Sequence, residues 1–396
     1  MSTSTKSKLC TDIGYVSMNH VGEQLCGDHV EVVGTENGKS TVIVLADGLG
    51  SGVKASILST LTAKIISTMM AAGMKLEDAV ETIIATLPVC AVRRVAYSTF
   101  TVLHFVDNSR AEIIQYDNPR VVLLRDGKNY EMPTTRVSIA GKEILRSEIE
   151  LQENDVFIAF SDGVEHAGVG GVYSFGWRRE DIISYVEEFW DVNASAMEMT
   201  SVLLAECERL YDGRPGDDAT VCTVRIRPSQ PVNLLYGPPS NRNDNYKMMS
   251  QFFEKEGKHI VCGGTTSSIA AHHLDKPLRV GFEYIDPDIP PVAELEGVDL
   301  VTEGVITVNR VVEYARQYLE DGKSYEEWCD KQDGASRIAR MLCVDATEIH
   351  FFVGCAVNPS HQNPTLPINF NIKMHLIKDL ADVLGHIGKR VKITYY

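Results

Sequence analysis

The sequence predicts two consecutive α/β domains, the first with sheets covered by helices and the second with a parallel sheet. Three observations lead to this prediction. The chain has 396 residues, whereas a single domain usually holds about 100 to 200. From residue 40 to 224, β-rich runs and two helical stretches are joined by short Asp, Asn and Gly turns. After residue 231, strand and helix patterns alternate, which is typical of β-α-β units.

The first domain contains β-rich runs with an excess of β-branched residues. Apolar residues at three- and four-residue spacing predict a helix over 57–74, and Gly73 is placed to end it. We expect its apolar residues, including Ile57 and Leu61, to face the core. A second helical region is expected over about 179–210, with a break near 191–195. The expected strands are 41–47, 97–107, 111–117, 121–127, 155–162 and 219–226.

The boundary between the domains is predicted in the segment RIRPSQP, residues 225–231, because two prolines stand there in a polar context. The domains are therefore expected at 1–228 and 229–396. In the second domain we expect helices at about 242–256 and from about residue 267, each preceded by a strand. Another strand-to-helix crossing is expected within 298–319.

Composition excludes several classes of partner. The formal net charge of −16 would repel phosphate backbones and anionic lipids, so we expect neither nucleic acid nor membrane surfaces as partners. The nine cysteines never fall two or three positions apart, which favours reduced thiols and a cytoplasmic location. No signal core or membrane-spanning segment is expected. The sequence leaves the oligomeric state open, including a homodimer.

Acidic residues follow or precede several of the expected strands. TVIVLADG and VFIAFSDG each end an apolar run in Asp-Gly, at Asp47 and Asp162. Asp217 and Asp218 come directly before the last strand, and Asp28 precedes another short strand. If the last strand runs antiparallel to the other two, all these acids are expected at one sheet edge.

Clustered carboxylates are the hard oxygen ligands that magnesium and manganese prefer. Without a metal they would raise one another's pKa. A glycine after each Asp would let the backbone approach an ion. Two other interpretations remain: each Asp-Gly is only a turn, or DGLGSG is a phosphate-binding loop. The second lacks the Gly-Lys-Ser/Thr ending of such a loop.

Five motifs occur in the order and approximate spacing of the PPM-class phosphatases: GDHVEVV, ADGLGSGVKAS, IIQYDNPRVVLLRDG, FSDGVEHAG and GDDATVCTVRI. Residues 10–228 most resemble the bacterial branch related to the stage II sporulation protein E phosphatase domain. The resemblance implies an α-β-β-α sandwich. It also implies a site with two Mn²⁺ or Mg²⁺ ions, at which a metal-bridging water hydrolyses phosphoserine or phosphothreonine.

The resemblance also implies roles for individual residues. Asp47 would bridge both metals, and Gly48 would be a ligand through its carbonyl. Asp162 and Asp217 would be ligands of the second metal, and Asp28 would act through metal-bound water. Asp218 would stand behind the ligands or replace one of them. The catalytic set is therefore Asp28, Asp47, Asp162 and Asp217.

The chain departs from its relatives at two places. No Lys or Arg occurs over 9–38, where eukaryotic relatives place a phosphate-holding arginine. YDNP replaces the Asn-Ala-Gly-His-type turn of many bacterial relatives. His166 is either a proton donor to the leaving serine oxygen or a surface histidine.

The second domain resembles no family by its motifs. A glycine turn and a helix start are expected at Gly263, Gly264, Thr265, Thr266 and Ser267, where free backbone amides would bind an anion. The alternative is that the hydroxyls only cap the helix. Parallel strands would bring Thr302, Glu303 and Gly304 to the same edge. We therefore expect either a small anionic or hydroxyl-rich ligand here or a docking module.

Three functions are compatible with these observations. The first is a regulatory phosphatase acting on a phosphorylated small protein, such as an anti-sigma-factor antagonist. The second is a catalytically silent phosphatase fold that only binds a partner. The third is a small-molecule phosphohydrolase. The presence of all the expected acids favours an enzyme.

Overall fold

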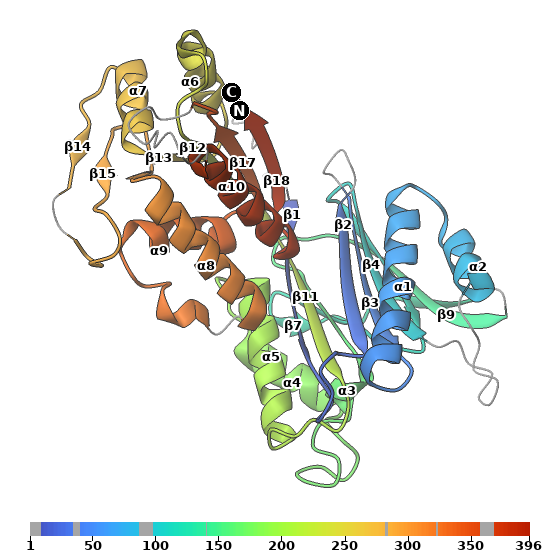
Figure 1. The fold of residues 1–396 in the computed structure, drawn as a ribbon. Helices are drawn as coiled ribbons and strands as arrows, with labels where there is room; N and C mark the ends of the chain where they lie inside the picture. The colour runs from blue at the N-terminus through green and yellow to red at the C-terminus, as the bar shows by residue number, and fades with distance from the viewer. Residues whose placement is uncertain are drawn as a thin grey trace, which may run out of the picture. The chain divides into compact units, whose positions relative to one another are not determined.

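The computed structural model describes residues 9–34, 40–86, 98–139, 141–281, 284–321, 324–356 and 368–396. The chain divides into two compact units, Met1–Pro228 and Ser229–Tyr396. Each unit has its own sheets and hydrophobic core, so each is described by itself (Figure 1).

The first unit contains two antiparallel sheets. The six-stranded sheet has the order β2 (Asp28–Gly34), β3 (Thr41–Gly48), β4 (Ser98–Val106), β5 (Arg110–Tyr116), β9 (Lys142–Glu150) and β8 (Thr134–Ile139). The five-stranded sheet has the order β1 (Leu9–Met18), β11 (Ala219–Pro228), β10 (Val156–Phe160), β6 (Val122–Arg125) and β7 (Lys128–Asn129).

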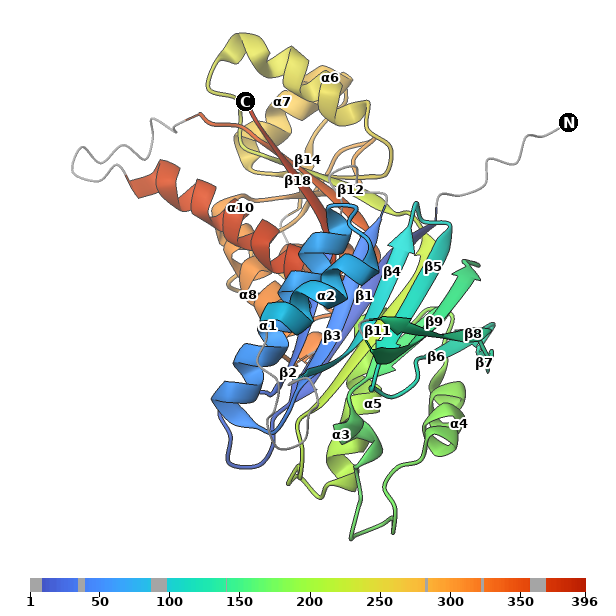
Figure 2. The same cartoon turned by 90° about the vertical axis from the view of Figure 1, so that its right-hand side faces the viewer.

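Helices cover the outer face of each sheet. Helices α1 (Gly52–Ala71) and α2 (Leu76–Thr86) pack on the six-stranded sheet, and α4 (Arg179–Phe189) and α5 (Ala196–Leu210) pack on the five-stranded one (Figure 2). A separate core fills the space between the sheets, where the Phe105 and Phe157 rings meet edge to face at 5.4 Å. The expected α-β-β-α sandwich is confirmed.

Helix α1 buries only part of its expected apolar stripe. Leu58 and Met70 are buried, but Ile57 and Leu61 are 54% and 44% exposed, so the assignment of these two to the core is wrong. The buried face also includes Ala55, Thr62 and Ala63, which are small or polar. Small residues are needed because the helix lies very close to β3. A Cβ atom added at Gly48 would stand 2.3 Å from the Ala55 carbonyl oxygen.

The second helical region breaks where the sequence indicated. Helix α4 ends at Phe189, and α5 begins after Ser195, whose side chain accepts a hydrogen bond from the Glu198 amide. The Glu198 carboxylate accepts one from the Ser195 amide in return. This capping box fixes the start of α5, which the apolar pattern alone places only roughly.

The linker is shorter than the segment 225–231 suggested. Strand β11 continues through Pro228, which lies opposite Leu9 of β1. Arg225 is only 8% exposed, because its guanidinium donates to the carbonyls of Val192 and Ala194. Pairing with β1 therefore extends the strand into residues whose polar composition is typical of a linker.

The second unit is built on a mostly parallel sheet, which confirms the α/β prediction. Strands β16 (Leu300–Thr302), β13 (Lys258–Cys262), β12 (Pro231–Tyr236), β17 (Glu348–Val353) and β18 (Arg390–Tyr395) are parallel neighbours in that order. Strands β15 (Ala293–Glu294) and β14 (Arg279–Val280) extend the β16 edge antiparallel. The parallel strands follow the doubly wound order, so ligands are expected at their carboxyl ends.

The helices of the second unit cover this sheet. Helices α6 (Asn245–Phe253) and α7 (Gly264–Leu274) pack on one face through Met248, Phe252 and Ala270. Helices α8 (Val305–Asp321), α9 (Gly334–Ala339) and α10 (Ile368–His386) form another group, in which α8 contacts both α9 and α10 (Figure 1). Helix α7 starts at Gly264, three residues before the expected position. Short helices occupy Asp162–Glu165 (α3), Arg242–Asp244, Ser324–Glu327 and Arg340–Asp345.

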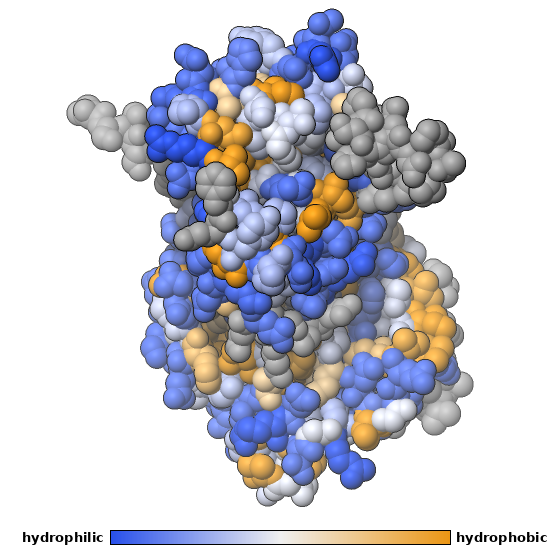
Figure 3. All heavy atoms as spheres, turned by 60° about the vertical axis from the view of Figure 1, so that its left-hand side comes forward, coloured by the Kyte–Doolittle hydropathy of each residue, from blue (hydrophilic) through white to orange (hydrophobic). Residues whose placement is uncertain are grey.

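No helix within the described residues is both long enough and apolar enough to cross a membrane. On the face drawn in Figure 3, hydrophobic residues form small groups among hydrophilic ones. Scattered apolar residues of this kind are ordinary on a folded domain.

Candidate metal centre and active site

The acidic residues of the first unit come from both of its sheets. Asp28 begins β2 and lies opposite Asp47, near the end of β3 in the same sheet. Asp162 follows β10, and Asp217 and Asp218 precede β11, in the other sheet. The expectation of a single sheet edge is therefore wrong, because β3 and β10 belong to different layers. The acids meet instead at one end of the sandwich.

Asp47 is the most perturbed of these carboxyl groups. Burial raises its pKa to about 9, with further contributions from the charges of Asp28, Asp162 and Asp217. Burial also raises the pKa of Asp28, to about 7, although hydrogen bonds from Ser161 and Thr220 act in the opposite direction. Several carboxylates are thus crowded together, and Asp28 is almost fully withdrawn from water.

Among the described residues, two carboxylate oxygens of this cluster have no hydrogen-bond partner. Asp28 is 5% exposed and Asp218 is 3% exposed. Within the described part of the chain, neither Asp28 Oδ2 nor Asp218 Oδ2 is engaged in a hydrogen bond. Asp218 Oδ1, in contrast, accepts from the His20 amide at 2.9 Å. Burying a carboxylate oxygen without a hydrogen-bond donor costs folding free energy, so these two oxygens indicate a place for a cation.

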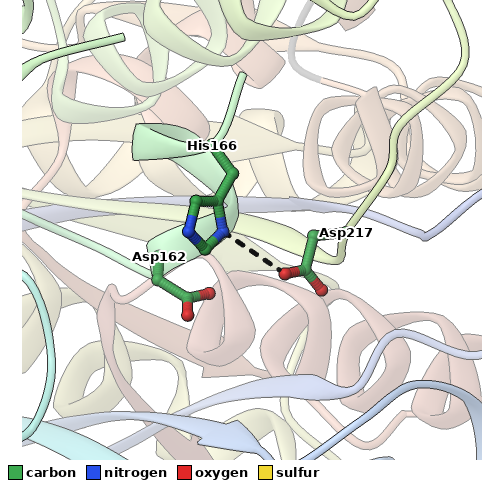
Figure 4. A group of neighbouring side chains, drawn as sticks. All are labelled: Asp162, His166 and Asp217. Atoms are coloured by element: carbon green, nitrogen blue, oxygen red, sulfur yellow. Dashed lines mark ion pairs between the residues drawn. The ribbon is translucent and has the colours of Figure 1, made fainter. Parts of the chain in front are cut away.

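A histidine joins the acidic cluster at its more exposed side. His166, just after α3, places Nδ1 at 3.5 Å from Asp217 Oδ2 (Figure 4). One ligand atom each from Asp162, His166 and Asp217 lies within 4.8 Å of the others, and the described residues contain one such group. Burial raises the pKa of Asp217, and the Asp162 charge adds to this, while the Asp218 amide and His166 counteract it.

The glycines next to the acids, two after and one before, are required by close packing. At Gly163 a Cβ atom would stand 2.1 Å from the Asp218 carbonyl oxygen, and at Gly27 it would stand 2.7 Å from Asp218 Oδ2. At Gly48 it would meet the backbone of Ala55. Only glycine therefore allows the strand ends to approach one another as closely as the acidic cluster requires.

Several residues that support the cluster were not found from the sequence. Ser161 and Thr220 hydrogen-bond Asp28, and the Ser161 hydroxyl also accepts from the Thr220 amide at 2.9 Å. Tyr211 donates to the Gly163 carbonyl at 2.6 Å. Ser161 stands next to Asp162 in the FSDG motif, but Thr220 and Tyr211 lie in ordinary strand and helix-end patterns. No sequence signal marks these two.

The donor set fits divalent metal ions. Asp28, Asp47, Asp162, Asp217 and Asp218 offer hard carboxylate oxygens, the ligand type that Mg²⁺ and Mn²⁺ prefer. The raised pKa values of Asp28, Asp47 and Asp217 are what crowded anions display without a cation. The same holds for the oxygens of Asp28 and Asp218 that have no partner among the described residues.

In the second unit, the two predicted crossings lie next to each other. A Cβ atom added at Gly304 would stand 3.5 Å from the Gly263 Cα atom. Gly263 is the residue before α7 and makes no side-chain cap. The Ser267 hydroxyl donates to the Gly263 carbonyl at 2.9 Å, and Thr302 Oγ1 donates to the Glu303 carbonyl at 2.9 Å. Ser267 therefore does not cap the helix as the alternative interpretation required. Thr265 is exposed, and Thr266 is 1% exposed.

Comparison with known families assigns most of the first unit to a family. Residues 37–227 match the family model described as Stage II sporulation protein E (SpoIIE). This segment is a SpoIIE-type domain. The match covers the acids at Asp47, Asp162, Asp217 and Asp218, and Asp28 lies just before it. Residues 1–36 and 228–396 are outside the match. No curated protein matches the chain in a sequence search.

Solved structures similar to the SpoIIE-type domain are described as phosphatases or their modules. The phosphatase domain of SpoIIE from Bacillus subtilis is 19% identical, with 57% of this chain and 96% of that chain covered and a TM-score of 0.44. The RsbU and RsbW domains of Rv1364c from Mycobacterium tuberculosis are 16% identical (61% and 68% covered, TM-score 0.46). The catalytic domain of serine/threonine phosphatase PstP, in complex with two manganese ions, is 14% identical (55% and 99% covered, TM-score 0.39).

Proposed function

We propose that residues 1–228 are a metal-dependent phosphatase that hydrolyses phosphoserine or phosphothreonine on a regulatory protein in the cytoplasm. The observation that carries this proposal is the convergence of acids from both sheets, where two buried carboxylate oxygens have no partner among the residues that the structure describes. A structural cluster of this kind would be strongly unfavourable without cations. The SpoIIE family match over 37–227 supports the same assignment.

The residues that would hold two Mn²⁺ or Mg²⁺ ions are Asp47, the Gly48 carbonyl, Asp162 and Asp217, with Asp218 beside them. When bound, such ions make a water acidic enough to attack phosphorus and neutralise charge on the phosphate. Asp28, with Oδ2 free to accept a hydrogen bond, would orient water at the site. Ser161 and Thr220 would hold the Asp28 carboxylate in place.

His166 is the candidate proton donor to the leaving oxygen. Its side chain is 54% exposed, so a substrate can reach it, and it lies beside Asp162 and Asp217. A serine or threonine alkoxide is a poor leaving group and benefits from protonation as the bond to phosphorus breaks. The hydrogen bond geometry to Asp217 would fix the orientation of the ring.

The substrate that we propose is a phosphorylated small protein, with an anti-sigma-factor antagonist as the example. The experiment compares turnover of phosphoserine and phosphothreonine proteins with turnover of nucleotides and sugar phosphates, using the full chain with Mn²⁺, with Mg²⁺ and with EDTA. We expect phosphoproteins to be preferred and all activity to disappear in EDTA. Preference for a nucleotide or sugar phosphate would make the protein a small-molecule phosphohydrolase. Undiminished activity in EDTA would refute the metal centre.

A further inference from the structure

The carboxyl edge of the parallel sheet in the second unit brings three chain crossings together. Tyr236, Cys262 and Thr302 end β12, β13 and β16, and they are paired in register as Tyr236 with Cys262 and Cys262 with Thr302. The chain then turns through Gly263 into α7 and through Gly304 into α8. The Gly263 amide donates to the Thr302 carbonyl at 2.9 Å, which ties the two turns to each other.

The N-termini of α7 and α8 therefore lie at the same edge of the sheet. Helix α7 has 11 residues and α8 has 17, and neither is preceded by a residue with a side chain that could accept from the first amides. The nearby hydroxyls of Ser267 and Ser268 donate to the backbone carbonyls of Gly263 and Gly264. Helix α7 has no side-chain cap within the described residues, and Gly304 before α8 has no side chain to supply one. The amides of these first turns carry partial positive charge at this edge.

The buried Tyr236 hydroxyl at this edge has no hydrogen-bond partner in the described part of the chain. Tyr236 is 2% exposed, and its hydroxyl makes no hydrogen bond within the described residues. Its ring lies against the start of α8, because Cε2 is 3.6 Å from the Cβ position of Gly304. Thr307, in the first turn of α8, is fully buried, and its hydroxyl is likewise unengaged among the described residues. Buried hydroxyls normally find partners, so both indicate a missing ligand.

Lys373 adds a positive charge to the amides and hydroxyls at this edge. Lys373 of α10 lies with Nζ 5.0 Å from the centroid of the Tyr236 ring, and it donates to the Gly354 carbonyl. An ammonium group has three donors, and the hydrogen bonds of Lys373 within the described residues use one, the bond to the Gly354 carbonyl, which leaves two for a ligand. Gly237 leaves room for it, since a Cβ atom there would stand 1.8 Å from Nζ. Burial lowers the pKa of Lys373 to about 8, and a bound anion would counter this effect.

We propose that the second unit binds the phosphate or carboxylate group of a small molecule at this edge, between the N-termini of α7 and α8, Tyr236 and Lys373. Backbone amides at helix starts, a tyrosine hydroxyl and a lysine ammonium are all donors, which is the composition of an oxyanion site. Glu303 is exposed beside Gly304 and would accept hydrogen bonds from hydroxyls of the same ligand. The site is independent of the phosphatase activity proposed above.

The test uses the full chain with Asp47→Asn in metal-free buffer, so that anions are not drawn to the acidic centre of the first unit. Calorimetry and thermal shift are measured with inorganic phosphate, citrate and AMP, which separate a bare phosphate, a carboxylate and a phosphate with hydroxyls. We expect at least one of them to bind with one-to-one stoichiometry. If none of the three binds, the proposal is wrong.

Two variants and a matched control locate the site. Tyr236→Phe removes only an unpartnered hydroxyl, and Lys373→Met removes the charge; each is expected to weaken binding about tenfold or more. Lys378→Met removes an exposed charge from the same helix and should leave affinity unchanged. Gly264→Val adds a side chain where no atom lies within 4 Å, so it should fold and still reduce affinity by covering the α7 amides. Unchanged affinity in both Tyr236→Phe and folded Gly264→Val would overturn the proposal.

Discussion

Asp28 and Asp47 lie directly opposite each other in the antiparallel pair β2 and β3. Side chains opposite each other in such a pair are neighbours, and like charges there are destabilising. The pair therefore places a buried carboxyl group, Asp28, beside a half-buried one, Asp47. This relationship, together with Asp162 and Asp217 from the other sheet, defines the candidate metal centre.

Asp47→Asn is expected to abolish catalysis without harming the fold. If Asp47 holds both ions, turnover with saturating Mn²⁺ should fall by more than about 100-fold. Removing a residue that only supports a metal ligand can already cost about 10- to 100-fold, and Asp47 would be a ligand itself. The melting temperature of the metal-free protein should stay the same or rise, because an anion with a raised pKa is removed. Steady-state assays and thermal melts measure both effects. Glu153→Gln, at an exposed acid, is the control, and near-normal turnover of Asp47→Asn would contradict the assignment.

His166→Gln separates a proton donor from a metal ligand. A proton donor matters most for a poor leaving group, so hydrolysis of a phosphoserine peptide should fall by about 100-fold while 4-nitrophenyl phosphate is nearly unaffected. The measurement is kcat/KM on both substrates over a range of Mn²⁺ concentrations. His386→Gln, at an exposed histidine of α10, serves as the control. Equal losses on both substrates with a higher metal requirement would instead make His166 a ligand.

Gly48→Ala is expected to destabilise the first unit by about 3 kcal/mol, because overpacking against a backbone atom cannot relax easily. The added methyl would stand 2.3 Å from the Ala55 carbonyl oxygen of α1. Gly34→Ala adds a methyl to β2 with no atom within 4 Å, and it should change stability little. Urea unfolding of the two variants measures the difference. Equal stabilities would show that α1 does not constrain this position.

A chain ending at Pro228 is expected to fold alone and to keep the metal-dependent activity. Strand β11 ends at Pro228, and the acids and the three cores of the first unit all precede that point. The fragment is tested by circular dichroism and by turnover with and without EDTA. An insoluble fragment would show that the first unit depends on residues 229–396 for its stability.

His350 predicts a pH dependence of stability. Burial lowers its pKa from 6.5 to about 4, with smaller contributions from Lys392 and Lys255. Between these values the unfolded chain binds a proton that the folded chain does not. Stability from this group is therefore complete above pH 6.5 and falls as the pH drops toward 4. Urea unfolding of the wild type and His350→Gln from pH 4 to 7.5 should differ in slope, and parallel curves would contradict the prediction.

The sequence alone predicted the residue types of the centre and the order of the elements around it. Asp-Gly after an apolar strand is a local signal, and so are the two helical stretches, the break near 191–195 and the strand and helix alternation of the second unit. The acids could be listed because metal chemistry restricts which side chains serve as ligands.

Only the tertiary structure decided which sheet carries each acid and which helix face is buried, because both depend on how the elements pack together. It placed Asp47 and Asp162 on different sheets, and it buried Ala55 and Thr62 of α1 in place of Ile57 and Leu61. In the second unit it brought Tyr236 and Lys373 together, although they lie 137 positions apart in the sequence. Periodicity gives a helix its apolar residues, but the closeness of the neighbouring strand selects the buried face. Contacts between distant segments carry no local signal, because they form only when the sheets and helices pack.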